Sequence, residues 1–361
     1  MSILADIKKS YPGFTLDVQI EAGSERVALL GASGCGKSCT LRCIAGVETP
    51  DEGRIVVNGT TFFDSKRGIN LTPQQRRCAL MFQNYQLFPH LTVRENVEAG
   101  MARAASADER AEAARRCLAV FGVSELDERY PLALSGGQQQ RVALSRMIAA
   151  RPGILMFDEP LSALDSYLKN ALEQNLLDLF SAADRTVLYV SHDIDEACRL
   201  CERIIVMHDG RVEEEGSVAA VVGAPRSLAG LRLTGCKNTS AAEKAGPTRV
   251  RALDWGMTFE MGRPVPDDVA HLGIRATHIH RDDSTGAAGA PARQNSFELA
   301  VARVSDARFE RVVLLDPPRA DAPSRLTWKV GTVDAPEGSL PHEGDVLRLH
   351  FDASRIHLVS R

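Results

Sequence analysis

The sequence predicts an α/β fold that carries a helical insertion and is followed by a small, separate all-β domain. Three observations support this prediction. Short apolar runs bounded by turn or charged residues are typical of buried parallel strands, and they occur at Ser24–Leu30, Gly153–Phe157 and Thr186–Ser191. Segments with apolar residues at helical spacing separate these runs. After about Gly235 the helical periodicity fades and short alternating runs begin.

Each element of the α/β part has a local cause. The strand Ser24–Leu30 leads into a glycine-rich loop, and Lys37–Ala45 has a helix-forming composition that ends at Gly46. Leucines of Ser166–Ala183 fall on one helical face, which predicts the crossover helix that a pair of parallel strands needs. Residues 99–130 are rich in Ala, Arg and Glu, and they predict the helical insertion.

The later part of the chain predicts strands. Asp209-Gly210, between apolar residues of Arg203–Val212, indicates a hairpin. Four alternating runs are expected to be strands: Phe297–Val304, Arg311–Leu315, Arg325–Val330 and Val346–Phe351. We therefore expect two domains, residues 1–235, with a helical subdomain at about 90–150, and residues 236–361, a small barrel-like (OB-like) β domain.

Composition narrows the class of protein. The chain has 361 residues, 44% of them hydrophobic and 25% charged, which is an ordinary globular composition. Its net charge of -4 argues against a large basic surface for nucleic acid. Apolar runs are far shorter than the ~20 residues of a spanning helix, and Met1–Ser10 lacks the apolar core of a secretory signal. We therefore expect a cytoplasmic protein. Its eight cysteines are expected to be reduced, and the single Cys198-x-x-Cys201 pair does not predict a metal site.

Residues Gly31–Ser38 read Gly-Ala-Ser-Gly-Cys-Gly-Lys-Ser, which fits the phosphate-binding spacing GxxxxGK[ST]. Glycines let the backbone N–H groups surround phosphate oxygens, Lys37 reaches the β- and γ-oxygens, and the Ser38 hydroxyl is a Mg²⁺ ligand. This loop predicts ATP and Mg²⁺ as cofactors.

Two carboxylates follow the apolar run Ile154–Phe157. Asp158 is expected to hold Mg²⁺, and Glu159 to act as the general base on the attacking water. An apolar run followed by Asp-Glu is a weak indication of a catalytic site by itself. Its position after a phosphate-binding loop makes that indication strong.

Leu134-Ser135-Gly136-Gly137-Gln138 resembles the LSGGQ motif of ABC-transporter ATPases. The resemblance covers residues 1 to about 235 and implies ATP hydrolysis. In that family the motif opens a helix and contacts the γ-phosphate of ATP held by a second copy, so it implies a head-to-tail homodimer. The nucleotide-binding residues expected on these grounds are Tyr11, Gly31, Ser33, Gly34, Cys35, Gly36, Lys37, Ser38, Cys39, Ser135, Gly136, Gly137, Gln138 and Asp165.

Further roles come from the same resemblance. Gln83 matches the residue that senses Mg²⁺ and the attacking water, and His192 matches the switch histidine that contacts the γ-phosphate. With Glu159 they form the expected catalytic set, while Ser38, Gln83 and Asp158 form the expected metal set. Asn84–His90 would face the transmembrane partner, and Pro160–Asp165 resembles the loop that crosses between the two copies. Either Tyr11 or Phe14 would stack on adenine.

The cargo is suggested by weaker similarities. Leu233–Asn238, Asp254-Trp255-Gly256 and Leu272–Ala276 resemble the junction and regulatory domain of oxyanion importers, above all for molybdate or tungstate. The implied partners are permease subunits and, through them, an external oxyanion-binding protein, with the chain peripheral on the cytoplasmic face of the membrane. Ala292–Ser296 matches the oxyanion-binding segment of that group only loosely. Importers of sulfate, a sugar or a polyamine remain alternatives, as does a soluble ABC ATPase of DNA repair or translation.

Overall fold

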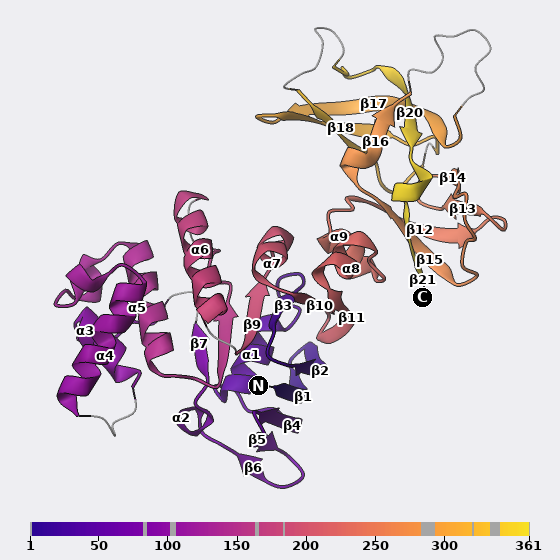
Figure 1. Cartoon of the computed structure of the whole chain (residues 1–361). Helices are drawn as coiled ribbons and strands as arrows, with labels where there is room; N and C mark the ends of the chain where they lie inside the picture. Colours follow the sequence, from indigo (N-terminus) through magenta and orange to yellow (C-terminus); the bar gives the residue numbers. More distant parts are fainter. Residues whose placement is uncertain are drawn as a thin grey trace. The chain divides into compact units, whose positions relative to one another are not determined.

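The structure is a computed structural model that describes residues 2–81, 85–101, 106–162, 166–182, 185–282, 293–319, 321–332 and 340–360. The chain divides into two compact units, Met1–Ala219 and Ala220–Arg361, which are drawn in Figure 1 and described separately below.

The first unit is built around a six-stranded sheet of order β11-β10-β3-β9-β8-β7. Its strands are β3 (Arg26–Leu30), β7 (Ala79–Met81), β8 (Ile154–Asp158), β9 (Thr186–Ser191), β10 (Arg203–His208) and β11 (Arg211–Ser217). All neighbours pair in parallel except β10 and β11. β9 is buried along its whole length, as expected for a strand covered on both faces. The β10–β11 turn places Asp209 and Gly210 at positive φ, which is the predicted hairpin.

A second, antiparallel sheet of the first unit was not predicted. Its order is β2-β1-β4-β5-β6, with β1 (Ile3–Tyr11), β2 (Phe14–Ala22), β4 (Glu52–Val57), β5 (Thr60–Asp64) and β6 (Ile69–Asn70). β1 and β2 alternate buried and exposed residues over much of their length, so one face is covered. Helix α1 (Lys37–Ala45) contacts strands of both sheets, and Leu41 and Ile44 belong to the core that the two sheets share.

Several helices of the first unit begin at residues whose side chains cap them. The helices of this unit are α1, α2 (Pro73–Arg76), α3 (Val93–Ala99), α4 (Ala107–Val120), α5 (Gly136–Ala149), α6 (Ser166–Ala182) and α7 (Ile194–Leu200), with 3₁₀ turns η1 (Ser124–Leu126) and η2 (Pro131–Ala133). Thr92, Ser106 and Ser135 each form a capping box at the start of α3, α4 and α5. Figure 1 shows these three helices packed together as the helical part of the unit.

The second unit is mainly β-structure. It contains two antiparallel sheets of order β14-β13-β12-β15-β21 and β16-β20-β17-β18-β19. Its elements are α9 (Leu228–Leu233), β12 (Asn238–Lys244), β13 (Arg249–Ala252), β14 (Met257–Glu260), β15 (Val269–Ile274), η3 (Ala276–His278), β16 (Ile279–Arg281), β17 (Ser296–Asp306), β18 (Glu310–Asp316), β19 (Leu326–Gly331), β20 (Val346–Phe351), η5 (Ala353–Arg355) and β21 (His357–Ser360). One apolar core, which includes Trp255, Phe259 and Phe351, joins the two sheets.

The predicted fold class, an α/β unit with a helical part followed by a small all-β domain, is confirmed. The division between the two units lies before the domain boundary that the sequence predicts between residues 235 and 236. It falls within α8 (Val218–Gly223) and assigns α9 to the second unit, because Leu231 packs against the backbone of Gly273 in β15. The domain assignment itself stays a prediction. In the described part of the chain, the helices are too short or too polar to span a membrane.

Candidate active site

The loop Gly31–Ser38 connects β3 to α1, and its glycines are required by two different constraints. Gly34 and Gly36 have φ of 83° and 104°, a region that costs other residues energy. A side chain at Gly31 would collide with the carbonyl oxygen of Met207, and one at Gly36 would lie 2.7 Å from Cδ1 of Leu16. Glycine is therefore favoured at Gly34 and Gly36 by the backbone conformation, and at Gly31 and Gly36 by the lack of space for a side chain.

Lys37 lies at the centre of this loop. Its side chain is only 4% exposed, and its ammonium group donates hydrogen bonds to the carbonyl oxygens of Gly31 at 2.8 Å and Ala32 at 2.9 Å. The same ammonium lies 3.9 Å from Sγ of Cys35, whose thiol pKa is raised by burial. A buried cation beside the backbone N–H groups of a helix start is suited to hold phosphate oxygens.

The fold brings together Ser38 and Asp158, which lie 120 positions apart in the sequence. Oγ of Ser38 donates a 2.7 Å hydrogen bond to Oδ1 of Asp158 at the end of β8. Burial raises the pKa of the Asp158 carboxyl, while the bond from Ser38 opposes that shift. A half-buried carboxylate beside a hydroxyl is a pair of hard oxygen ligands that favours a divalent cation, so these residues fit Mg²⁺.

Glu159 and His192 lie at the ends of the adjacent strands β8 and β9. The backbone of Glu159 has φ of 46°, which is uncommon for a residue other than glycine and is often found at functional sites. Its N–H donates to the carbonyl of Val190 at 3.0 Å, and its Oε2 lies 3.2 Å from Nδ1 of His192. The two candidate catalytic side chains are thus in contact, and both remain partly open to solvent.

The motif Leu134–Gln138, here called the signature turn, opens α5. Ser135 is its N-cap: its Oγ accepts from the N–H of Gln138, and Oε1 of Gln138 accepts from the N–H of Ser135 at 2.9 Å. Ser135 and Gly136 are exposed, and a Cβ atom added to Gly136 would meet no other atom within 4 Å. The hydrogen bonds of Ser135 are made within its own turn, so the described contacts do not join it to the phosphate-binding loop of the same chain.

The two candidate aromatic residues for stacking lie next to each other at the β1–β2 turn. The ring centroids of Tyr11 and Phe14 are 5.9 Å apart. The hydroxyl of Tyr11 donates to Glu48, and burial followed by this bond raises the Tyr11 pKa. Phe14 instead points toward the loop, because its Cζ lies 3.0 Å from where a Cβ on Gly36 would be. Both residues border the start of α1, and the choice between them stays open.

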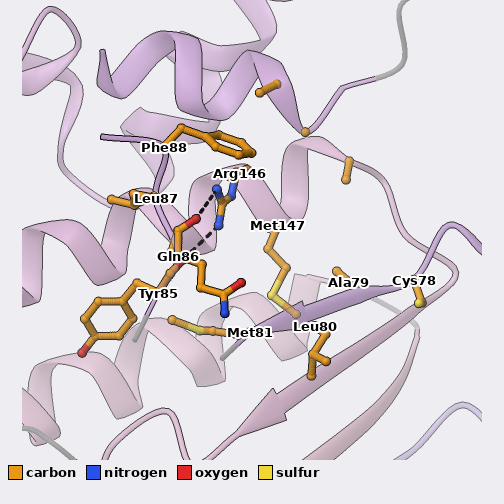
Figure 2. Close-up of a pocket in the computed structure, with 14 residues that line it drawn as sticks. Cys78, Ala79, Leu80, Met81, Tyr85, Gln86, Leu87, Phe88, Arg146 and Met147 are labelled. Carbon is orange, nitrogen blue, oxygen red and sulfur yellow. Dashed lines mark hydrogen bonds between the residues drawn. The ribbon is translucent and has the colours of Figure 1, made fainter. Parts of the chain in front are cut away.

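A pocket of about 540 Å³ lies between the loop after β7 and the helices α3 and α5. Figure 2 shows Arg146 of α5 reaching the loop: its guanidinium donates 2.9 Å hydrogen bonds to the carbonyls of Tyr85 and Gln86 and lies over the ring of Phe88. Tyr85 and Gln86 have φ of 53° and 44°, so Arg146 stabilises two successive left-handed residues. Burial lowers the pKa of this guanidinium.

Gln83 and Asp165 lie outside the described residues, as does Asn84, and their roles stay predictions. Sequence reasoning missed Arg146, because an arginine inside a helix gives no sign of its partner. It also missed Lys169 and Glu196, which lie near His192 in the turn between β9 and α7. The spacing Asp193-x-x-Glu196 is a recognisable helix-start pattern that could have pointed to Glu196.

Polar residues singled out in the second unit have structural partners. The side-chain amide of Asn295 bonds both the N–H and the carbonyl of Glu260, at 2.7 and 2.8 Å. The guanidinium of Arg275 donates to the carbonyls of Val222 and Thr234. These contacts give both side chains a role in holding their own unit together.

The fold and these contacts define a phosphate-binding-loop nucleotide-binding unit. Residues 15–162 match the ABC transporter family. The chain is 35% identical to the Fe(3+) ions import ATP-binding protein FbpC of Brucella abortus, over 78% of this chain and 80% of that protein. The chain therefore belongs to the ABC transporter family.

Other similarities agree with this assignment. The chain is 42% identical to the molybdenum import ATP-binding protein ModC of Pseudomonas aeruginosa, over 58% of this chain and 58% of that protein. Proteins named for sulfate/thiosulfate and for spermidine/putrescine import match at 39% identity. The molybdenum and sulfate matches span 58% to 64% of those relatives' lengths. A solved dimeric ATP-binding cassette in a post-hydrolysis state with ADP and Pi is 33% identical, with a TM-score of 0.52 over 60% of this chain and 99% of that one.

Proposed function

We propose that the chain is the ATP-hydrolysing subunit of an ABC importer. The observation that carries this proposal is the grouping of Ser38, Asp158, Glu159 and His192 through two close contacts where β8 and β9 end and α1 begins. Family membership supports it, as do the names of the relatives, which are import ATP-binding proteins.

The proposed chemistry follows from the positions of these groups. Lys37 and the loop N–H groups bind the phosphate oxygens, while Ser38 and Asp158 hold Mg²⁺. When bound, Mg²⁺ neutralises charge on the phosphate oxygens. Glu159 accepts a proton from the attacking water as general base, and His192, 3.2 Å away, orients that carboxylate and reaches toward the γ-phosphate. Gln83 is proposed to contact the metal and water, and Asp165 the second copy.

A second copy completes the site in this proposal. Ser135 and Gly136 are exposed at the N-terminus of α5, where the helix dipole and backbone N–H groups attract an anion. They are proposed to contact the γ-phosphate bound by the partner chain, so that closure of a homodimer and hydrolysis are coupled. The similarity to a solved cassette that is dimeric supports the dimer in this proposal.

The permease is proposed to dock at the pocket beside Arg146. Phe88, 44% exposed, and the apolar side chains of Leu87 and Met147 border a groove that a short amphipathic helix could occupy. This contact would keep the subunit on the cytoplasmic face of the membrane.

The cargo proposed is an oxyanion, molybdate or tungstate. Sequence similarities of Asp254-Trp255-Gly256 and Leu272–Ala276 support it, as do the relatives named for molybdenum import at 41% and 42% identity. Relatives named for sulfate/thiosulfate, spermidine/putrescine and Fe(3+) keep those cargoes as alternatives.

Hydrolysis is tested by phosphate release from the purified chain with ATP and Mg²⁺, with Lys37→Ala as the inactive control. Absence of release by the native chain, alone and with its permease, would overturn the proposed activity.

Cargo is tested separately in liposomes that contain the permease, with the binding protein and each candidate solute added. We expect molybdate or tungstate to stimulate hydrolysis and sulfate to do so much less. Stimulation by a polyamine or ferric ion instead would remove the oxyanion assignment and leave the ATPase proposal intact.

A further inference from the structure

We propose that Lys169 is a positioning residue for hydrolysis, because it fixes the turn that carries His192 against Glu159. The inference rests on the proposed function, since it assigns Lys169 a part in the same reaction. Lys169 belongs to α6, while the turn lies between β9 and α7.

The ammonium group of Lys169 joins two carboxylates that follow His192. It lies 2.8 Å from Oδ2 of Asp193 and 2.7 Å from Oε1 of Glu196. Asp193 is also the N-cap of α7, where its Oδ1 accepts from the N–H groups of Asp195 and Glu196. A single cation therefore fixes both the N-cap residue of α7 and a carboxylate of its first turn.

Glu196 extends this contact to the strand that precedes His192. Its side chain is buried, and its Oε2 accepts hydrogen bonds from the Ser191 hydroxyl at 2.7 Å and the Tyr189 hydroxyl at 3.0 Å. Oγ of Ser191 in turn accepts from the N–H of Asp193 at 3.0 Å. Both oxygens of the buried carboxylate are thus partnered, as a buried charge requires.

These bonds hold the backbone on both sides of His192. The imidazole itself is 61% exposed, and its described contact is the 3.2 Å approach of Nδ1 to Glu159. Because the ring is so exposed, packing against neighbouring side chains does little to fix its orientation. Its direction must therefore come from Ser191 and Asp193, which Lys169 and Glu196 hold in place.

The same two helices carry a second ion pair that makes a matched control. Arg199 of α7 donates two 2.8 Å hydrogen bonds to the carboxylate of Glu173 in α6. This pair also joins α6 to α7, but it bonds neither Ser191 nor Asp193. If Lys169 only fastened the helices together, the loss of either pair would have the same effect.

The experiment compares Lys169→Met, Lys169→Arg and Arg199→Met in the full chain, with kcat and KM for ATP measured at steady state. Misplacement of a catalytic group by about 1 Å costs on the order of 100-fold in rate. We expect kcat of Lys169→Met to fall by roughly ten- to 100-fold with KM within about two-fold of native. Lys169→Arg should restore most of the rate, and Arg199→Met should stay near native. Equal losses in Lys169→Met and Arg199→Met, or a change in KM alone, would overturn the proposal.

Further variants make the result decisive. If Lys169→Met does not fold, Lys169→Met/Glu196→Gln removes the unpaired buried charge and should show the same kcat loss. In a His192→Ala background Lys169→Met should cause no further loss of kcat, whereas an independent further loss would contradict a role through His192. Glu159→Gln separates the two proposals: if it keeps native turnover the proposed function fails, and if it is inactive while Lys169→Met is native only this inference fails.

Discussion

The two units of the chain use similar polar residues for opposite purposes. In residues 1–219 the side chains of Asp158, Glu159 and His192 lie where β8 and β9 end. Asp158 is bonded to the Ser38 hydroxyl, whereas Glu159 and His192 contact each other and stay partly open to solvent. In residues 220–361 Asn295 and Arg275 are bonded to backbone groups of their own unit. The difference teaches that residue type alone does not mark a binding site. Polar side chains that contact one another at the ends of adjacent strands and stay partly open to solvent are a better mark of one.

A parallel contrast exists within the first unit. The phosphate-binding loop is bonded to the end of β8 through Ser38 and to the β10–β11 turn through the carbonyl of Cys35. In the signature turn, Ser135 and Gly136 are exposed, and the side chain of Ser135 bonds only within that turn. In the proposed site, one chain therefore supplies the phosphate-binding loop, and a second copy supplies the signature turn.

The largest expected effect comes from Glu159→Gln. Loss of a general base costs about 10²–10⁴-fold in rate, while Asp158 and Lys37 continue to hold metal and phosphates. ATP affinity should stay near native and steady-state phosphate release should fall by that factor. Native turnover by this variant would remove Glu159 from the proposed role.

The two halves of the site should separate under substitution. Lys37→Ala removes the buried cation and should weaken ATP binding to the monomer, whereas Ser135→Arg should leave monomer binding nearly native and prevent dimer closure. Titration of labelled ATP at low protein concentration measures both. Equal weakening in the two variants would contradict a site shared between copies.

The loop at Tyr85 and Gln86 should depend on Arg146. Arg146→Ala leaves two carbonyls without their charged donor, a loss of about 1–3 kcal/mol of local stability. Hydrogen exchange of peptides covering 85–91 should accelerate accordingly. Arg141→Ala is the control, because that side chain makes longer bonds of 3.3 and 3.4 Å to other carbonyls of the same helical part. Unchanged exchange in Arg146→Ala would show that the loop holds its own conformation.

The second unit should lose stability in acid through His357. Burial, followed by the charge of Arg275, lowers the pKa of this imidazole from 6.5 to about 4. The unfolded chain therefore binds the proton at higher pH, so the contribution of neutral His357 is complete above about pH 6.5 and is lost toward pH 4. After allowance for solvent screening it is on the order of 2 kcal/mol.

Tryptophan fluorescence measures this effect, because Trp255 and Trp328 both lie in the second unit. Urea unfolding of the full chain between pH 7 and pH 4 should show a smaller loss of stability in His357→Gln than in the native chain. An identical pH profile in both would exclude His357 as the cause.

The smallest expected effect concerns the second unit and oxyanions. Because the Asn295 amide is occupied by Glu260, calorimetric titration of the full chain with molybdate should give weak or absent binding. Submillimolar binding that is lost in Asn295→Ala would reverse this view of the second unit.

The sequence predicted those parts whose causes are local. Gly31–Ser38, the helix Lys37–Ala45 and the Asp209-Gly210 hairpin each follow from short-range geometry, and the family assignment follows from ordered motifs. The antiparallel sheet containing β1 and β2 was not predicted: its β1–β2 hairpin is local, but the sheet forms only when β1 also pairs with β4, which lies far along the chain. For the same reason the contacts of Arg146 and Lys169 could not be predicted.

The central claim, that ATP hydrolysis requires the signature turn of a second copy, is tested most directly by light scattering of the Glu159→Gln chain with ATP. The account predicts a dimer with ATP, a monomer without it, and a monomer with ATP once Ser135→Arg is added. A dimer that forms equally without ATP, or that persists in the Glu159→Gln/Ser135→Arg chain, would contradict it.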